Sequence, residues 1–142
     1  MSESLGRSIL NTSRRLVSNI NNSLDEFGID VTFDQLDVLM HLNNNLNNAF
    51  IQNDIADDLG KSKSGILRTI DILEKKGYVA RKISKNDRRK NLIVITTKGR
   101  EVTNRACVEM KEIEADLIDE IDLKDIQKCK KVLNCIFNKI SI

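Results

Sequence analysis

The chain has 142 residues, of which 40% are hydrophobic and 31% are charged, and its formal net charge is +2. This length fits a single domain with one core, and the balance is ordinary for a soluble globular protein. Proline is absent and there are only six glycines, which favours long uninterrupted helices. No apolar run approaches the roughly 20 residues of a membrane-spanning helix, and residues 1–10 lack the layout of a signal peptide, so we expect a cytoplasmic protein.

Positive charge is concentrated in residues 61–90, which contain eleven Lys and Arg against Asp71, Glu74 and Asp87. That segment therefore carries +8, and the rest of the chain carries −6. A positive block in an otherwise acidic chain indicates a polyanionic partner.

Long amphipathic helices are expected at both ends of the chain. A stripe of apolar residues predicts one helix over residues 5–27, and similar stripes predict helices over about 98–121, capped by Thr97, and after Asp122. Thr32 and Gln35 form a capping box at the start of another helix that ends near residue 42. The terminal stripes are too long for a small central unit to cover, so they are expected to pack on one another and on a second subunit.

The strongest motif is a helix-turn-helix in residues 52–76. Ala56 is small enough for two helices to cross closely, and Gly60 suits the tight turn between them. Ser62 is the expected N-cap of the second helix. Five apolar residues provide a shared core: Ile55, Leu59, Ile66, Ile70 and Leu73. Two β-rich segments follow, 78–83 and 91–96, joined by a polar stretch.

In such a unit the second helix enters the DNA major groove by its N-terminal part. The candidate contact residues on it are Ser62, Lys63, Ser64, Arg68 and Thr69. Arg68 is long enough for a bidentate contact with guanine, which discriminates by about 1–3 kcal/mol. The alternative is that Lys63 and Arg68 only solvate a helix face.

The hairpin is a candidate minor-groove element, because a narrow minor groove attracts arginine. Its basic residues are Arg81, Lys82, Lys85, Arg88, Arg89 and Lys90. Asp87 would repel phosphate, so we interpret it as a residue that orients Arg89. The predicted wing contacts are therefore Lys85, Asp87, Arg88, Arg89 and Lys90.

These residues resemble the MarR (multiple antibiotic resistance regulator) family over nearly the whole chain. The similar segments are QNDIADDLG at 52–60, LEKKGYV at 73–79, NDRR at 86–89 and LIVITTKG at 92–99. Two departures stand out: Ile51 occupies a capping position where the family often has Ser or Thr, and Gly65 occupies a position where it often has Thr or Ala. Glycine inside a helix costs up to about 1 kcal/mol relative to alanine.

The resemblance implies a mainly α fold with a small two- or three-stranded β wing and flanking dimerisation helices. We expect one domain over 1–142, with a winged helix-turn-helix lobe at 32–96 and dimerisation helices at 5–27 and 98–141. The resemblance further implies a homodimer that binds a pseudo-palindromic DNA operator, usually as a repressor. In the family's wing pattern the main minor-groove arginine is Arg89. The resemblance also implies release by a small-molecule effector, whose contact residues the sequence does not name.

No catalytic constellation or cofactor motif is present. Gly60-Lys61-Ser62 lacks the earlier glycine of a phosphate-binding loop, and the single histidine, His41, cannot form a zinc site with Cys107, Cys129 and Cys135. We interpret His41 as a surface or C-terminal helix-capping residue. Cys129 falls on the apolar stripe of the last helix, so we expect it to pack as a small hydrophobe. The leading hypothesis is a DNA-binding regulator without enzymatic activity. The alternatives are a winged protein-interaction module without specific DNA binding, and a thiol-based redox-responsive regulator.

Overall fold

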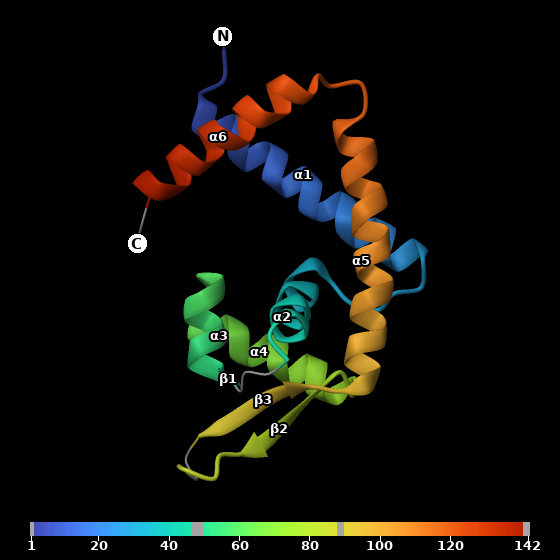
Figure 1. Ribbon diagram of the computed structural model, residues 1–142, viewed down its shortest axis with the longest axis vertical. Helices are drawn as coiled ribbons and strands as arrows, with labels where there is room; N and C mark the ends of the chain where they lie inside the picture. Colours follow the sequence, from blue (N-terminus) through green and yellow to red (C-terminus); the bar gives the residue numbers. More distant parts are fainter. Residues whose placement is uncertain (1, 47–49, 88–89, 141–142) are drawn as a thin grey trace. The chain divides into compact units, whose positions relative to one another are not determined.

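The computed structural model describes residues 2–46, 50–87 and 90–140. Their elements follow the order α1 (Leu5–Glu26), α2 (Phe33–Asn44), β1 (Phe50–Ile51), α3 (Gln52–Leu59), α4 (Lys63–Lys75), β2 (Val79–Ile83), β3 (Asn91–Ile95), α5 (Thr97–Ile118) and α6 (Leu123–Lys139) (Figure 1). The expected fold class, mainly helical with a small β wing, is confirmed.

The chain divides into two compact units, Met1–Glu109 and Met110–Ile142, and α5 runs from the first into the second. The domain predictions for 1–142, 32–96, 5–27 and 98–141 concern folding and assembly, and they stay predictions. Within the described residues, no helix is long and apolar enough to cross a membrane.

Side-chain caps set the starts of several helices, as the sequence predicts. At α2, the Thr32 N–H donates to Gln35 Oε1 at 3.2 Å and the Gln35 N–H donates to Thr32 Oγ1 at 3.4 Å, which completes the capping box. At α6, Asp122 Oδ1 accepts from the Lys124 N–H at 2.9 Å. Each bond satisfies a backbone donor that the first helical turn leaves unpaired.

The predicted cap of α5 is wrong by one residue. Thr96, not Thr97, accepts the Gly99 N–H at 3.0 Å, and Thr97 is already the first residue of the helix. The Thr96 hydroxyl in turn donates to Gly77 O at 2.6 Å. Thr96 therefore joins the end of the hairpin, the turn after α4 and the start of α5.

The sheet has the strand order β1-β3-β2, and both pairings are antiparallel. In the β2–β3 hairpin Val79 pairs with Ile95 and Ile83 with Asn91. The two-residue strand β1 pairs with β3 and was not located by the sequence, because it is too short to show alternation. Figure 1 shows the hairpin projecting beyond the helices of its unit.

The core of the first unit lies between α2, α3, α4 and the sheet. Its completely buried aliphatic side chains include Leu36, Leu39, Ile55, Ile66, Ile70, Leu73 and Ile93. Gly99 closes this core against the turn before β2, since a Cβ at this position would lie 2.1 Å from Tyr78 O. The start of α5 can approach the hairpin only because residue 99 has no side chain.

Candidate nucleic-acid interface

The turn between α3 and α4 has the geometry that the sequence predicts. Gly60 adopts the left-handed conformation with φ 62° and ψ 34°, which glycine reaches without strain. Ala56 is buried, as are Ile55 on the same helix and Ile66 on α4, in agreement with a close packing of the two helices. The buried side of α4 therefore anchors the helix in the lobe and leaves its opposite side exposed.

Hydrogen bonds within α4 engage two of the five predicted contact residues. Ser62 Oγ accepts from the Gly65 N–H at 3.1 Å, and the Thr69 hydroxyl donates to Gly65 O at 3.0 Å. A Cβ on residue 65 would lie 2.9 Å from Ser62 Oγ. Gly65, which departs from the family pattern, thus gives Ser62 the space to cap the helix.

The other three predicted residues, Lys63, Ser64 and Arg68, are exposed on α4. Among residues 2–46, 50–87 and 90–140, neither Lys63 nor Arg68 forms an ion pair. A residue that the sequence analysis missed, Leu67, lies between them and is 42% exposed. A leucine is usually expected in a core, so the sequence does not single out Leu67. Its exposure follows from the orientation of α4 in the folded lobe.

Arg81 joins β2 to α4 through two carboxylates. Its guanidinium donates to Asp71 Oδ1 and to Glu74 Oε1, each at 2.6 Å. The hydrogen bond to Asp71 is the main reason that the pKa of Arg81 is raised above its ordinary value. Arg81 was predicted as part of the basic hairpin, but here it neutralises the acidic residues of α4 and ties the hairpin to that helix.

Two further cations of the basic block are engaged inside the lobe. Lys61 Nζ lies 3.0 Å from Asp34 Oδ1 and 3.3 Å from Asp37 Oδ2, so it links the turn after α3 to α2. Lys76 Nζ donates to Asp30 O and lies 3.3 Å from Gln35 Oε1.

The described Lys and Arg residues of 61–90 thus form two groups, those that pair with a carboxylate and those that do not. Within the described part of 61–90, the exposed cations without an ion pair are Lys63, Arg68, Lys75, Lys82, Lys85 and Lys90. They lie on α4 and on the hairpin, the two elements that the sequence assigns to the interface. Arg88 and Arg89 fall outside the described residues, and so does the predicted contact between Asp87 and Arg89.

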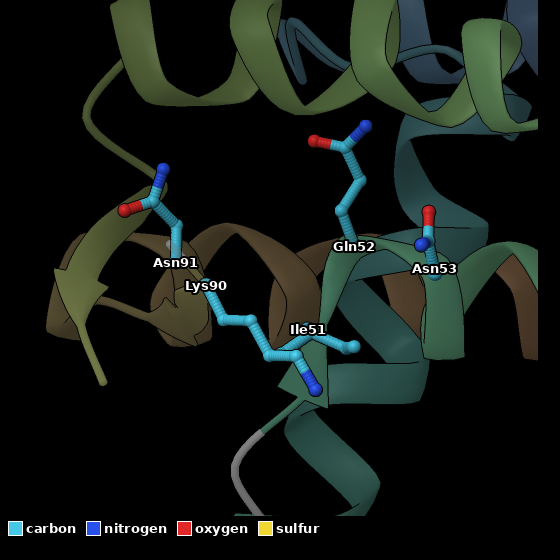
Figure 2. Close-up of a pocket in the computed structure, with 5 residues that line it drawn as sticks. All are labelled: Ile51, Gln52, Asn53, Lys90 and Asn91. Carbon is cyan, nitrogen blue, oxygen red and sulfur yellow. The ribbon is translucent and has the colours of Figure 1, made fainter. Parts of the chain in front are cut away.

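Two hydrogen bonds close the loop at the tip of the hairpin, which borders a pocket. The Ser84 N–H donates to Lys90 O at 3.1 Å, and the Lys90 N–H donates to Asp87 O at 3.0 Å. The pocket, of about 220 Å³, is lined by Ile51, Gln52, Asn53, Lys90 and Asn91. Figure 2 shows the amides of Gln52 and Asn53 pointing to the same side and Lys90 extending towards Ile51. Ile51 provides no side-chain cap to α3.

Among the described residues of the lobe, Tyr78 has a strongly shifted pKa. Burial raises the pKa of Tyr78 to about 12, and the hydrogen bond that its hydroxyl donates to Asp30 adds to the shift. Lys98 Nζ lies 5.4 Å from the centre of the Tyr78 ring. Tyr78 thus stays neutral and fixes the segment between α4 and β2.

His41 lies in the last turn of α2, as the sequence predicts, but it is not a surface residue. His41 Nε2 lies 3.1 Å from Asp58 Oδ2 and its ring packs 4.9 Å from that of Phe50, so the side chain joins α2 to α3 and is mostly buried. In this single chain Cys129 and Cys135 are exposed and Cys107 is half-buried, so the packing of Cys129 as a small hydrophobe stays a prediction. Within the described residues, no group of three His, Cys, Asp or Glu side chains could hold a metal ion.

Comparisons with known proteins identify a single family. A sequence model of the MarR family matches residues 29–90. The transcriptional repressor MprA of Escherichia coli K12 is 32% identical over 97 residues, which are 68% of this chain and 54% of MprA. The HTH-type transcriptional regulator YfiV of Bacillus subtilis is 35% identical over 74 residues, 52% of this chain and 45% of YfiV. The chain therefore spans about half the length of these curated relatives.

Solved structures with the same fold include two DNA complexes. The DNA complex of MepR from Staphylococcus aureus has a TM-score of 0.90 and 21% identity, and the match covers 98% of this chain and all of that one. The repressor CouR bound to a 23-mer duplex has a TM-score of 0.80 and 25% identity, covering 94% of this chain and 92% of CouR. The fold is thus the winged helix of these regulators.

Proposed function

The chain belongs to the MarR family. We propose that it binds duplex DNA as a homodimer and acts as a transcriptional repressor. α4 enters the major groove, and the hairpin contacts the minor groove and the neighbouring phosphates. MepR and CouR, which share the fold, were both solved in complex with DNA.

The observation that carries the proposal is the separation of paired from unpaired cations. Lys61, Lys76 and Arg81 neutralise carboxylates inside the lobe, whereas the exposed cations of α4 and the hairpin have no described carboxylate partner. Unpaired Lys and Arg on one helix and the adjacent wing provide the charge that releases counterions from DNA. A protein-interaction module would not need such a surface.

The redox alternative draws on the thiols of Cys129 and Cys135, which are exposed in the single chain. Exposure is one requirement of a reactive thiol, and a lowered pKa is the other. Substitution of all three cysteines by serine distinguishes the two functions: a thiol-based regulator loses its response to peroxide, whereas a regulator that does not depend on thiols keeps its DNA affinity and does not respond to peroxide before or after the substitution.

A salt titration of binding to random duplex DNA tests the proposal. Several phosphate contacts predict that the logarithm of the binding constant falls with the logarithm of salt concentration, with a slope of about −0.9 per contact. Lys63→Gln and Lys85→Gln are each expected to make this slope shallower by about one contact. Arg68→Ala is expected to relax sequence preference, and Arg89→Ala to weaken binding to all sequences.

Lys61→Gln is the matched control, since it removes a charge of the same block that is already paired with Asp34 and Asp37. It is expected to leave the salt slope unchanged. No measurable duplex binding at low salt would refute the proposal, and an equal change of slope for Lys61→Gln and Lys63→Gln would refute the assigned interface.

Two implications of the family remain to be tested separately. Dimerisation through 5–27 and 98–141 predicts a two-fold operator with half-sites about one helical turn apart. Effector release predicts that a small molecule lowers DNA affinity, and a screen of ligands against the protein–operator complex measures it.

A further inference from the structure

We propose that Leu67 recognises the 5-methyl group of a thymine in the major groove and so contributes to operator choice. The inference rests on the proposed DNA-binding function and assigns a specificity role to a residue of the same surface.

Leu67 lies on the exposed side of α4, in its N-terminal half. Ile66, Ile70 and Leu73 mark the buried side of the helix. With 3.6 residues per turn, Leu67 follows Lys63 and Ser64 by about one turn on the exposed side, and Arg68 is its neighbour there. An aliphatic side chain is thus placed among the groups that face the groove.

The polar groups of this surface leave one chemical feature of the groove without a counterpart. Lys63 and Arg68 are donors and suit guanine or phosphate oxygens. The hydroxyls of Ser62 and Thr69 already bond to the backbone at Gly65. The thymine 5-methyl is the apolar group that a base pair presents in the major groove. A leucine side chain matches that methyl and none of the hydrogen-bonding groups.

The charges next to Leu67 would not repel the phosphates of a DNA duplex. Asp71 and Glu74 follow Leu67 by four and seven residues, on the same side of α4. Both carboxylates are held by the Arg81 guanidinium at 2.6 Å. The side of the helix that continues from Leu67 therefore does not present an unpaired acid to the phosphates.

Ile72 is a matched reference on the same helix. It is 42% exposed, the same as Leu67, but it lies about 140° around the helix axis and in the C-terminal half. If exposure of an aliphatic group on α4 were sufficient for an effect on DNA binding, both residues would behave alike. Recognition of a methyl requires the position of Leu67.

The test removes single methyl groups from the DNA. An operator is selected from random duplexes, and each thymine is replaced in turn by deoxyuridine, which lacks only the 5-methyl group. At one thymine in each half-site, the wild-type protein is expected to lose affinity about fourfold per methyl. Leu67→Ala is expected to bind the thymine and deoxyuridine operators equally, whereas Ile72→Ala keeps the wild-type preference.

The outcomes separate this inference from the proposed function. Wild-type indifference to every replacement, or a preference retained in Leu67→Ala, overturns the role of Leu67 and leaves DNA binding standing. A protein that binds no duplex overturns both. Because Leu67 is exposed, its alanine variant is expected to fold, and circular dichroism and the thermal midpoint verify this before binding is measured.

Discussion

α4 and α6 are both amphipathic helices, but they use their apolar sides differently. α4 buries Ile66, Ile70 and Leu73 inside the first unit. α6 buries no residue, and its Phe137 is 77% exposed. An apolar stripe therefore predicts that a helix needs a covering surface, without saying whether that surface belongs to the same chain. For α6 the proposed cover is a second copy of the protein.

A pair of leucine substitutions tests this contrast most severely. Leu39 is completely buried and Leu133 is 45% exposed. Leu39→Ala is expected to lower the free energy of unfolding by about 2–5 kcal/mol at every protein concentration. Leu133→Ala is expected to raise the dissociation constant of the dimer, while the stability of the dilute monomer stays close to that of the wild type. Chemical denaturation and sedimentation equilibrium measure the two effects.

The contrast fails if Leu133→Ala destabilises a dilute monomer as much as Leu39→Ala does. In that case α6 would belong to the core of its own chain, and the proposed dimer surface would lie elsewhere.

Substitutions at two glycines test how closely the lobe is packed. Gly99→Ala places a Cβ 2.1 Å from Tyr78 O, in backbone that cannot move without opening the hairpin, and is expected to cost about 1–3 kcal/mol. Gly6→Ala meets no atom within 4 Å on exposed α1, and is expected to stabilise the helix by up to about 1 kcal/mol. Thermal unfolding distinguishes the two signs. Equal effects would mean that the close contact at Gly99 is not maintained in solution.

Tyr78 sets an alkaline limit on the stability of the lobe. Its pKa is raised to about 12 in the folded protein, against 10.0 for an ordinary tyrosine. The unfolded chain therefore loses the phenolic proton first, and stability that is complete below pH 10 is lost as the pH rises towards 12. Tyr78→Phe is expected to remove this part of the pH dependence. An unchanged alkaline slope in that variant would assign it to other groups.

The smallest effect is expected at Gly65. Alanine gains helix propensity of up to about 1 kcal/mol, but it displaces the Ser62 hydroxyl, a cap that contributes about the same. The net change in unfolding free energy should thus lie close to zero. Ser62→Ala in the wild type should lower stability, whereas in Gly65→Ala it should have little further effect, and a double-mutant cycle measures the coupling. Full additivity would show that Gly65 does not serve the cap.

Much of the site could be predicted because it depends on local chemistry. The Thr32–Gln35 capping box, the Ser62 cap and the Gly60 turn each involve residues a few positions apart, and each was located from the sequence. The exposed state of Lys63 and Arg68 followed from the periodicity of α4. The roles of Arg81 and Leu67 did not follow, because pairing with Asp71 and exposure on a helix depend on how the hairpin packs against α4.

The sequence by itself determined the helices, the turn and the concentration of positive charge in residues 61–90. The tertiary structure reveals which of those charges form ion pairs inside the lobe, which glycines permit close packing, and which apolar stripe stays exposed in the single chain. The physical reason is range: caps and turns are stabilised by neighbours in the chain, whereas ion pairs and burial require segments that only folding brings together.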